Sequence, residues 1–273
     1  VEEDGYYASY HYGRQNLTRT QQSETLGESF CVLFGIADEE RAAKVISSMP
    51  VGEFGPPIFS PQIVSQPDYH NNGVWPYVTS FWGKAAAKVG NETALMHALA
   101  CNVRTASIYA TNYENYSFNT GNPYTTQINS PNMLWGLSGF MGLFHRTFFG
   151  LEFTKEGLAL KPFVPTVLAG TRKLEAFPYR GMKLDITVSG SGNEIASCLV
   201  DGKEAEAFIP ADWTGNHSIE IVMKGEHKPS SVNMVGYIGM PEVPAVKAEA
   251  GKLQWNAISG AAKYWVLKDG QKV

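Results

Sequence analysis

Residues 130–144 have the sequence SPNMLWGLSGFMGLF, and this stretch decides the fold that we expect. Ser130 is a good N-cap residue, Pro131 fits the first helical position, and Gly150 fits a helix end. Because residues 130–144 include no charged side chain, the predicted helix is apolar on all sides. Such a helix is ordinarily surrounded by protein. We therefore expect the helices of this chain to form more than one layer.

Four further helices are predicted upstream, because apolar residues recur there at three- and four-residue steps. Pro50 stops the second helix and Gly90 the third, while residues 50–67 form a long loop rich in Pro and Gly. The expected helix starts are near Glu24, after Asp38, near Trp75 and Pro76, and after Asn91.

From Leu151 onward the apolar period changes to two, which is typical of strands. Asp201-Gly202 between two apolar runs predicts a hairpin. Short strands with turns every 8–12 residues favour an antiparallel β-sandwich. We thus divide the chain into a helical part (1–150), a β-sandwich (151–240), and a linker with the start of a fibronectin type III-like module (241–273).

Composition excludes several classes of protein. The chain has 273 residues, with 22 Lys and Arg against 26 Asp and Glu, and a formal net charge of −4. Without a basic block, a nucleic-acid partner is not expected, and no apolar run approaches the ~20 residues of a membrane span. Three distant cysteines, Cys31, Cys101 and Cys198, form neither a disulfide framework nor a metal motif. We expect no cofactor.

The first candidate site is the segment YENYSFNTG, residues 113–121. It places the carboxylate of Glu114 beside Tyr113 and Tyr116, with several Asn residues nearby. Aromatic rings stack on sugars, amides bond hydroxyl groups, and a carboxylate can activate water. On the residues alone, the alternative is a solvated loop acid, the usual position of a glutamate.

The second candidate site is PDYHNNGVWPYVTSFW, residues 67–82. Trp75 is a candidate stacking platform, and Tyr69, His70 and Asn71 are candidate sugar ligands. On the residues alone, a core role for Trp75 and a hydrogen-bonded loop position for His70 are the favoured alternatives. His70 has no His or Cys partner at ligand spacing, so no metal site is expected.

Together, YHNNGVWPYV, the glutamate loop and SPNMLWGLSGFMGLF resemble the C-terminal part of six-hairpin (α/α)6-barrel glycosidases. This group includes glucoamylase, trehalase, processing α-glucosidases and glycogen-debranching-like enzymes. The resemblance implies a partial (α/α)6 toroid, Glu114 as general base, Trp135 in the last barrel helix, and a trailing β-sandwich. Where relatives often have Arg-Gly, this chain has Asn71-Asn72, so the sugar preference does not transfer. The general acid is expected in an N-terminal part that precedes Val1.

The resemblance implies an inverting glycoside hydrolase of oligo- or polysaccharides, inactive as this piece alone and secreted or periplasmic by analogy. Two alternatives remain. A glycoside phosphorylase would need basic or hydroxyl residues for phosphate, and only His70 and Thr125-Thr126 lie near the candidate segments. A non-catalytic carbohydrate-binding or scaffold protein is the other alternative, because β-sandwich and fibronectin-like modules often serve binding.

Overall fold

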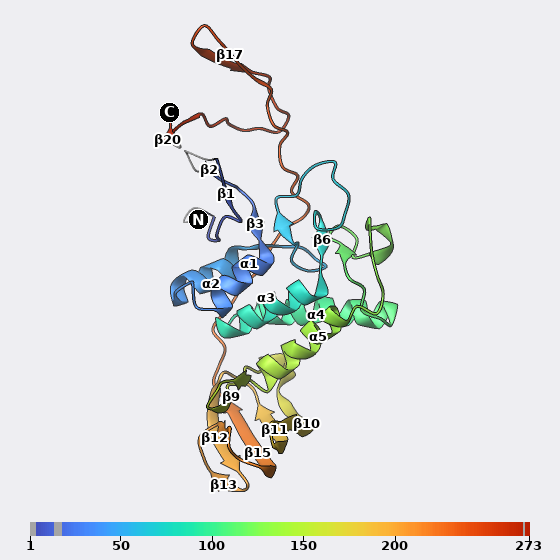
Figure 1. Ribbon diagram of the computed structural model, residues 1–273, viewed down its shortest axis with the longest axis vertical. Helices are drawn as coiled ribbons and strands as arrows, with labels where there is room; N and C mark the ends of the chain where they lie inside the picture. Colours follow the sequence, from blue (N-terminus) through green and yellow to red (C-terminus); the bar gives the residue numbers. More distant parts are fainter. Residues whose placement is uncertain (1–3, 14–17, 270) are drawn as a thin grey trace.

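The computed structural model describes residues 4–13, 18–269 and 271–273. The helices occupy the middle of the molecule, the two larger sheets lie at one end, and a C-terminal hairpin lies at the other (Figure 1). Within the described residues there are five α-helices: α1 (Thr25–Leu33), α2 (Glu39–Ser48), α3 (Pro76–Lys88), α4 (Glu92–Tyr109) and α5 (Leu134–Leu143).

Helix α3 is the centre of the helical part, since it contacts α1, α2, α4 and α5. Its apolar side chains, with Trp82 fully buried, join those of the other helices in one core. The remaining core members include Val45, Ile46, Leu95 and Leu143, which are all fully buried.

Side-chain caps start α2 and α4 where the sequence predicts them. Asp38 accepts the backbone N–H of Arg41 at 2.8 Å, and Asn91 accepts that of Ala94 at 2.9 Å. The predicted cap at Ser130 is wrong, because α5 begins at Leu134 after Met133, without a side-chain cap. After α5 a π-helical turn, η2 (Phe144–Phe148), leads to the strands.

Short strand pairs fasten the long loops between the helices. The pair β6 (Gly73–Val74) and β7 (Tyr116–Ser117) is antiparallel and brings two distant loops together. The other pairs are β1 (His11–Tyr12) with β2 (Thr18–Arg19), β3 (Ser23–Glu24) with β5 (Phe59–Ser60), and β4 (Pro50–Val51) with β16 (Asn233–Met234).

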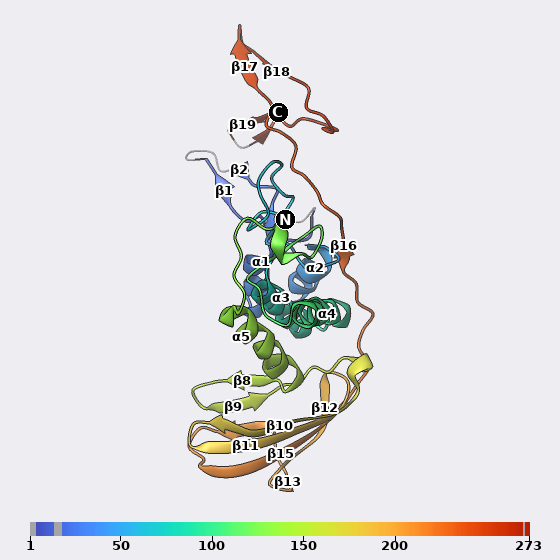
Figure 2. The ribbon, with the colours of Figure 1, turned by 90° about the vertical axis from the view of Figure 1, so that its right-hand side faces the viewer.

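Residues 151–224 form two sheets that share a second core. The larger sheet has the order β10-β11-β15-β12-β13, and the smaller has the order β14-β9-β8. Strands β8 and β9 lie over the larger sheet (Figure 2). The bounds are β8 (Leu151–Phe153), β9 (Gly157–Leu160), β10 (Gly170–Tyr179), β11 (Met182–Gly190), β12 (Glu194–Val200), β13 (Lys203–Glu204), β14 (Phe208–Pro210) and β15 (Gly215–Lys224).

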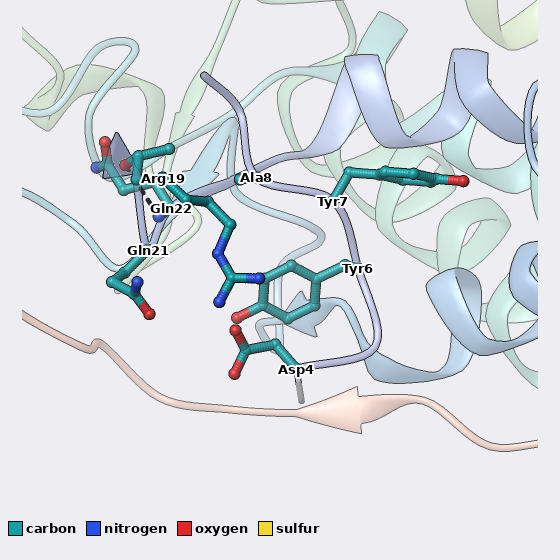
Figure 3. Close-up of a pocket in the computed structure, with 8 residues that line it drawn as sticks. Asp4, Tyr6, Tyr7, Ala8, Arg19, Gln21 and Gln22 are labelled. Carbon is teal, nitrogen blue, oxygen red and sulfur yellow. Dashed lines mark hydrogen bonds between the residues drawn. The ribbon is translucent and has the colours of Figure 1, made fainter. Parts of the chain in front are cut away.

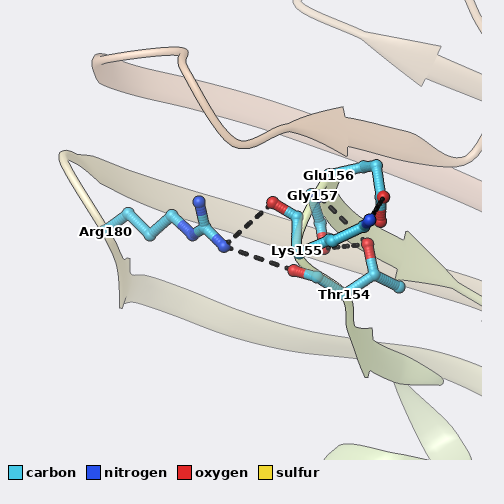
Figure 4. Close-up of polar contacts among 5 residues, drawn as sticks. All are labelled: Thr154, Lys155, Glu156, Gly157 and Arg180. Carbon is cyan, nitrogen blue, oxygen red and sulfur yellow. Dashed lines mark hydrogen bonds and ion pairs between the residues drawn. The ribbon is translucent and has the colours of Figure 1, made fainter.

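Turns of the two sheets are linked by Arg180 (Figure 4). Its guanidinium group donates to the carbonyl oxygens of Thr154 and Lys155 at 3.2 and 3.3 Å. The neighbouring ion pair of Lys155 with Glu156, at 3.4 Å, is largely exposed. Exposed pairs of this kind contribute little stability, so the backbone contacts of Arg180 are the more useful link.

The expected fold class, a partial (α/α)6 toroid followed by an antiparallel β-sandwich, is wrong. Helices hold only 27% of the residues, and strands hold 30% in small sheets. The helices pack around α3, and irregular loops replace further helix pairs. The larger sheet is mixed, because β11 and β15 pair in parallel. Alternating apolar residues predict strands but do not specify the direction in which they pair.

The start of a fibronectin type III-like module is not formed either. Residues 246–273 hold two separate hairpins, β17 (Val246–Glu249) with β18 (Lys252–Trp255), and β19 (Leu267–Lys268) with β20 (Gln271–Lys272). All described residues of these strands are exposed, and two-stranded hairpins without a covered face are only marginally stable.

No helix in the described part of the chain combines the length and apolar character needed to cross a membrane.

Candidate functional site

The two candidate segments meet in the structure. The hydroxyl group of Tyr69 donates a hydrogen bond to Oε1 of Glu114 at 3.4 Å. Both side chains are half-buried. The meeting follows from the β6–β7 pair, in which Val74 faces Tyr116 and so aligns the segments that carry Tyr69 and Glu114.

A network of backbone and amide contacts holds the Glu114 loop. The backbone N–H of Glu114 donates to the carbonyl oxygen of Ser130 at 3.0 Å. The side chain of Asn129 bonds both backbone groups of Asn115, since its Oδ1 accepts the Asn115 N–H at 3.3 Å and its Nδ2 donates to the Asn115 carbonyl oxygen at 2.7 Å. The side-chain Nδ2 of Asn115 donates to the carbonyl oxygen of Ile128 at 3.0 Å. The buried Asn115 therefore stabilises the loop.

Asp68 links the two segments through hydrogen bonds. Its carboxylate accepts hydrogen bonds from Nδ2 of Asn72 at 2.8 Å and from the hydroxyl group of Ser117 at 2.6 Å. Its carbonyl oxygen accepts the backbone N–H of Gln127 at 2.8 Å. Because Tyr69 is the next residue, these bonds also fix the backbone that carries the Tyr69 ring.

Trp75 lies at the centre of an aromatic cluster and is only 3% exposed. Its Nε1–H donates to the carbonyl oxygen of Tyr69 at 3.0 Å. Its ring centroid lies 5.2 Å from that of Tyr69, 5.0 Å from that of His70 and 5.4 Å from that of Trp135. This is the core position that the residues alone favoured, and it leaves little of the indole for a sugar.

The exposed rings of the cluster are better placed to meet a ligand. Trp135 is 41% exposed and stacks on Tyr77, with centroids 4.6 Å apart and planes at 20°. His70 is exposed and stacks on Trp75. Tyr77 is not among the predicted site residues. Its position directly after Pro76, in the first turn of the helix that follows Trp75, is the sequence signal that points to it.

The other predicted residues have mostly structural positions. Asn71 is buried and bonds the loop through the backbone of Ile63 and Gln66, so its amide groups are occupied. Tyr116 is 1% exposed, and its hydroxyl group accepts the backbone N–H of Tyr113. The hydroxyl group of Tyr113 donates to that of Tyr124 at 3.3 Å.

The electrostatics of the site keep the Tyr69 hydroxyl group protonated. Burial, followed by the nearby Glu114 carboxylate, raises the pKa of Tyr69 above its usual range. Burial, followed by the charge of Glu24, likewise raises the pKa of Tyr77. Both phenols can therefore act as hydrogen-bond donors near neutral pH, and Tyr69 presents its proton to Glu114.

Elsewhere, Asp4, Tyr6, Arg19 and Gln22 are among the residues that line a shallow depression, open to solvent (Figure 3). Ligand pockets usually enclose roughly 300–1,000 Å³, whereas this depression encloses essentially no volume, so it is not a ligand pocket. Within the described ranges, no three His, Cys, Asp or Glu side chains gather as metal ligands.

No protein-family model matches the chain, and no curated protein matches it.

Proposed function

We propose that this chain carries the general-base part of a glycoside-hydrolase site that acts on oligo- or polysaccharides. The observation that supports the proposal is the contact between Tyr69 and Glu114, at 3.4 Å, next to an aromatic cluster in which Trp75 contacts both Tyr69 and the partly exposed ring of Trp135. Sugar sites commonly combine an aromatic face with a few placed polar groups.

In the proposed reaction Glu114 acts as a carboxylate base. It removes a proton from a water molecule, whose oxygen attacks the anomeric carbon as the glycosidic bond breaks. A general acid on the opposite face of the sugar protonates the leaving oxygen, and the anomeric configuration inverts. The Tyr69 hydroxyl group donates to Oε1 of Glu114 and so leaves Oε2 to accept the water proton.

The general acid has to come from outside the aromatic cluster. Of the carboxylates that reach the cluster, Glu24 already accepts the backbone N–H groups of Leu26 and Gly27, and Asp68 accepts Asn72 and Ser117. Both carboxylates are thus already engaged as hydrogen-bond acceptors within this chain. We therefore propose that the acid lies in a further part of the protein, and by analogy that the protein is secreted or periplasmic.

The second candidate is carbohydrate binding without hydrolysis. The exposed Trp135 and His70 favour it, since both can stack on a sugar without any acid group. The phosphorylase alternative has less support, because the hydroxyl groups of Thr125 and Thr126 bond to nearby backbone carbonyls at 3.4 and 3.1 Å.

The test compares Glu114→Gln with the wild type in a protein that contains this chain and its general acid. We expect oligosaccharide binding, measured by calorimetry, to persist while release of reducing ends falls by roughly 10²-fold or more. Glu226→Gln, at an exposed loop position, is the matched control and should keep full turnover. Binding without hydrolysis in the wild type would favour the second candidate, and unchanged turnover in Glu114→Gln would exclude Glu114 as the base.

A further inference from the structure

Helix α5 leaves much of its apolar surface uncovered. Leu134 is 76% exposed and Met141 is 46% exposed, and they lie two turns apart on one side of the helix. The opposite side, with Gly136, Gly139 and Leu143, is buried against the helical core. Residues 134–143 contain no charged side chain, so nothing in α5 itself makes the exposed side polar.

The uncovered surface continues across α3 onto α1. Phe81 of α3 meets Phe30 of α1 edge-on at 5.1 Å, and Phe30 meets Phe34 at 5.2 Å. Phe34 is 72% exposed at the end of α1. We call Phe30, Phe34, Phe81, Leu134 and Met141 the α1–α5 apolar face. Large exposed apolar patches on a protein surface mark interaction sites.

Lys84 of α3 lies in this face. The ammonium group of Lys84 lies 4.4 Å from the centroid of Phe81, and a methyl group added at Gly142 would lie 3.0 Å from Nζ. Among the described residues, no carboxylate pairs with Lys84, and Arg146 is the charged group that acts on it. Burial, followed by the charge of Arg146, lowers the pKa of Lys84 to about 8. An opposite charge placed next to such a cation favours its charged form.

We infer that the α1–α5 apolar face binds a partner protein through an apolar surface that carries a carboxylate, and that this carboxylate pairs with Lys84. A protein fits better than a sugar, because exposed Leu and Met side chains offer no hydrogen bonds to hydroxyl groups. A second copy related by a two-fold axis fits poorly, since the same patch would face itself and bring cations together. The inference is independent of the proposed hydrolysis.

The experiment uses a carbodiimide, which joins an amine to a carboxylate in direct contact. The purified chain is mixed with soluble extract of its source organism and treated, and mass spectrometry maps the residues joined to Lys84. We expect an isopeptide bond from Nζ of Lys84 to an Asp or Glu of another protein. That protein is then purified, and its binding to the chain is measured directly.

Variants test whether the contact of Lys84 contributes to the affinity for the captured protein. Removing one member of a buried charge pair typically weakens binding by ~30-fold or more, so we expect that loss in Lys84→Gln. Leu134→Asp should also weaken binding and keep the fold, because the side chain is exposed. Lys84→Arg should bind but not couple, and Lys155→Gln, on a distant turn, should match the wild type. Thermal melting checks that each variant is folded.

Several results would overturn the inference. One is coupling of Lys84 to a carboxylate of this same chain, within one molecule or between two copies. Another is no coupling of Lys84 at all in the extract. The third is a captured protein whose affinity is the same for the wild type and Lys84→Gln, because capture alone does not support the site.

Discussion

Glu28 of α1 gives the chain a stability that depends on pH. Its side chain is only 3% exposed, and Oε2 has no hydrogen-bond partner among the described residues. Burial raises the pKa of this carboxyl group from 4.5 to about 8, although the backbone N–H of Tyr7 opposes the shift. The neighbouring charge of Glu24 adds to the increase. Near neutral pH, the folded chain therefore holds a proton on Glu28.

The sign of the effect follows from proton binding. Between the unfolded pKa of 4.5 and the folded pKa of about 8, the folded state binds a proton that the unfolded state releases. The free energy of unfolding therefore falls as pH rises through this window, and Glu28 adds no further dependence on pH below or above it. Each pKa unit corresponds to about 1.4 kcal/mol, so the whole window corresponds to about 3–5 kcal/mol.

The substitution Glu28→Gln replaces the protonated acid by a neutral side chain of the same shape. We expect the variant to match the wild type near pH 5 and to be more stable by about 3–5 kcal/mol near pH 9. Urea denaturation, followed by tryptophan fluorescence at several pH values, measures this difference. Lys84 titrates in both proteins, so its contribution cancels in the comparison.

Glu226→Gln is the control, because Glu226 is an exposed loop residue. It should follow the wild type at every pH. A constant difference between Glu28→Gln and the wild type across the range would refute the reasoning, since it would mean that Glu28 ionises as easily in the folded as in the unfolded state.

Three further predictions concern the framework of the site. Trp75→Ala should lower the free energy of unfolding in urea by about 3–5 kcal/mol, while the exposed Trp135→Ala should lower it by less than about 1 kcal/mol and still weaken oligosaccharide binding in calorimetry. Gly150→Ala should lower the melting temperature far more than Gly90→Ala. An added methyl group at Gly150 would clash with the backbone of Lys161, whereas one at Gly90 would meet nothing within 4 Å. Asp68→Ala leaves two donors without their acceptor, at about 1–3 kcal/mol each, and should speed amide hydrogen exchange in residues 112–130.

The helices were predictable where a local signal sets their ends. Asp38 and Asn91 each satisfy a free backbone N–H group at a helix start, and a single residue type suffices for that. Ser130 has the same chemistry, yet its hydroxyl group contacts the carbonyl oxygen of Pro131, and the helix begins four residues later. The backbone N–H of Glu114 bonds the carbonyl oxygen of Ser130, so a tertiary contact overrides the cap.

The site was predictable as a pair of segments but not as a set of roles. Tyr69 and Glu114 lie together, and the residues around them are the aromatic and amide types that the two motifs contain. Trp75 and Asn71 lie on either side of β6 in the sequence, and both are buried where β6 pairs with β7. The spacing of residues does not reveal this pairing. Tyr77 entered the cluster because α5 crosses α3 closely at Gly139, where an added methyl group would lie 3.1 Å from Tyr77.

The expectation that α5 is surrounded by protein and the inference about Lys84 concern the same physical question. An apolar sequence indicates that the surface of a helix is more stable away from water, but it does not indicate which residues cover that surface. We expected the covering to come from neighbouring helices of this chain, and the structure leaves Leu134 and Met141 exposed. Lys84 contacts Phe81 in the same apolar face and pairs with no carboxylate of the described residues, so the partner that we infer is apolar and negative at once. A requirement for burial that the described residues do not meet among themselves is therefore an argument for a partner.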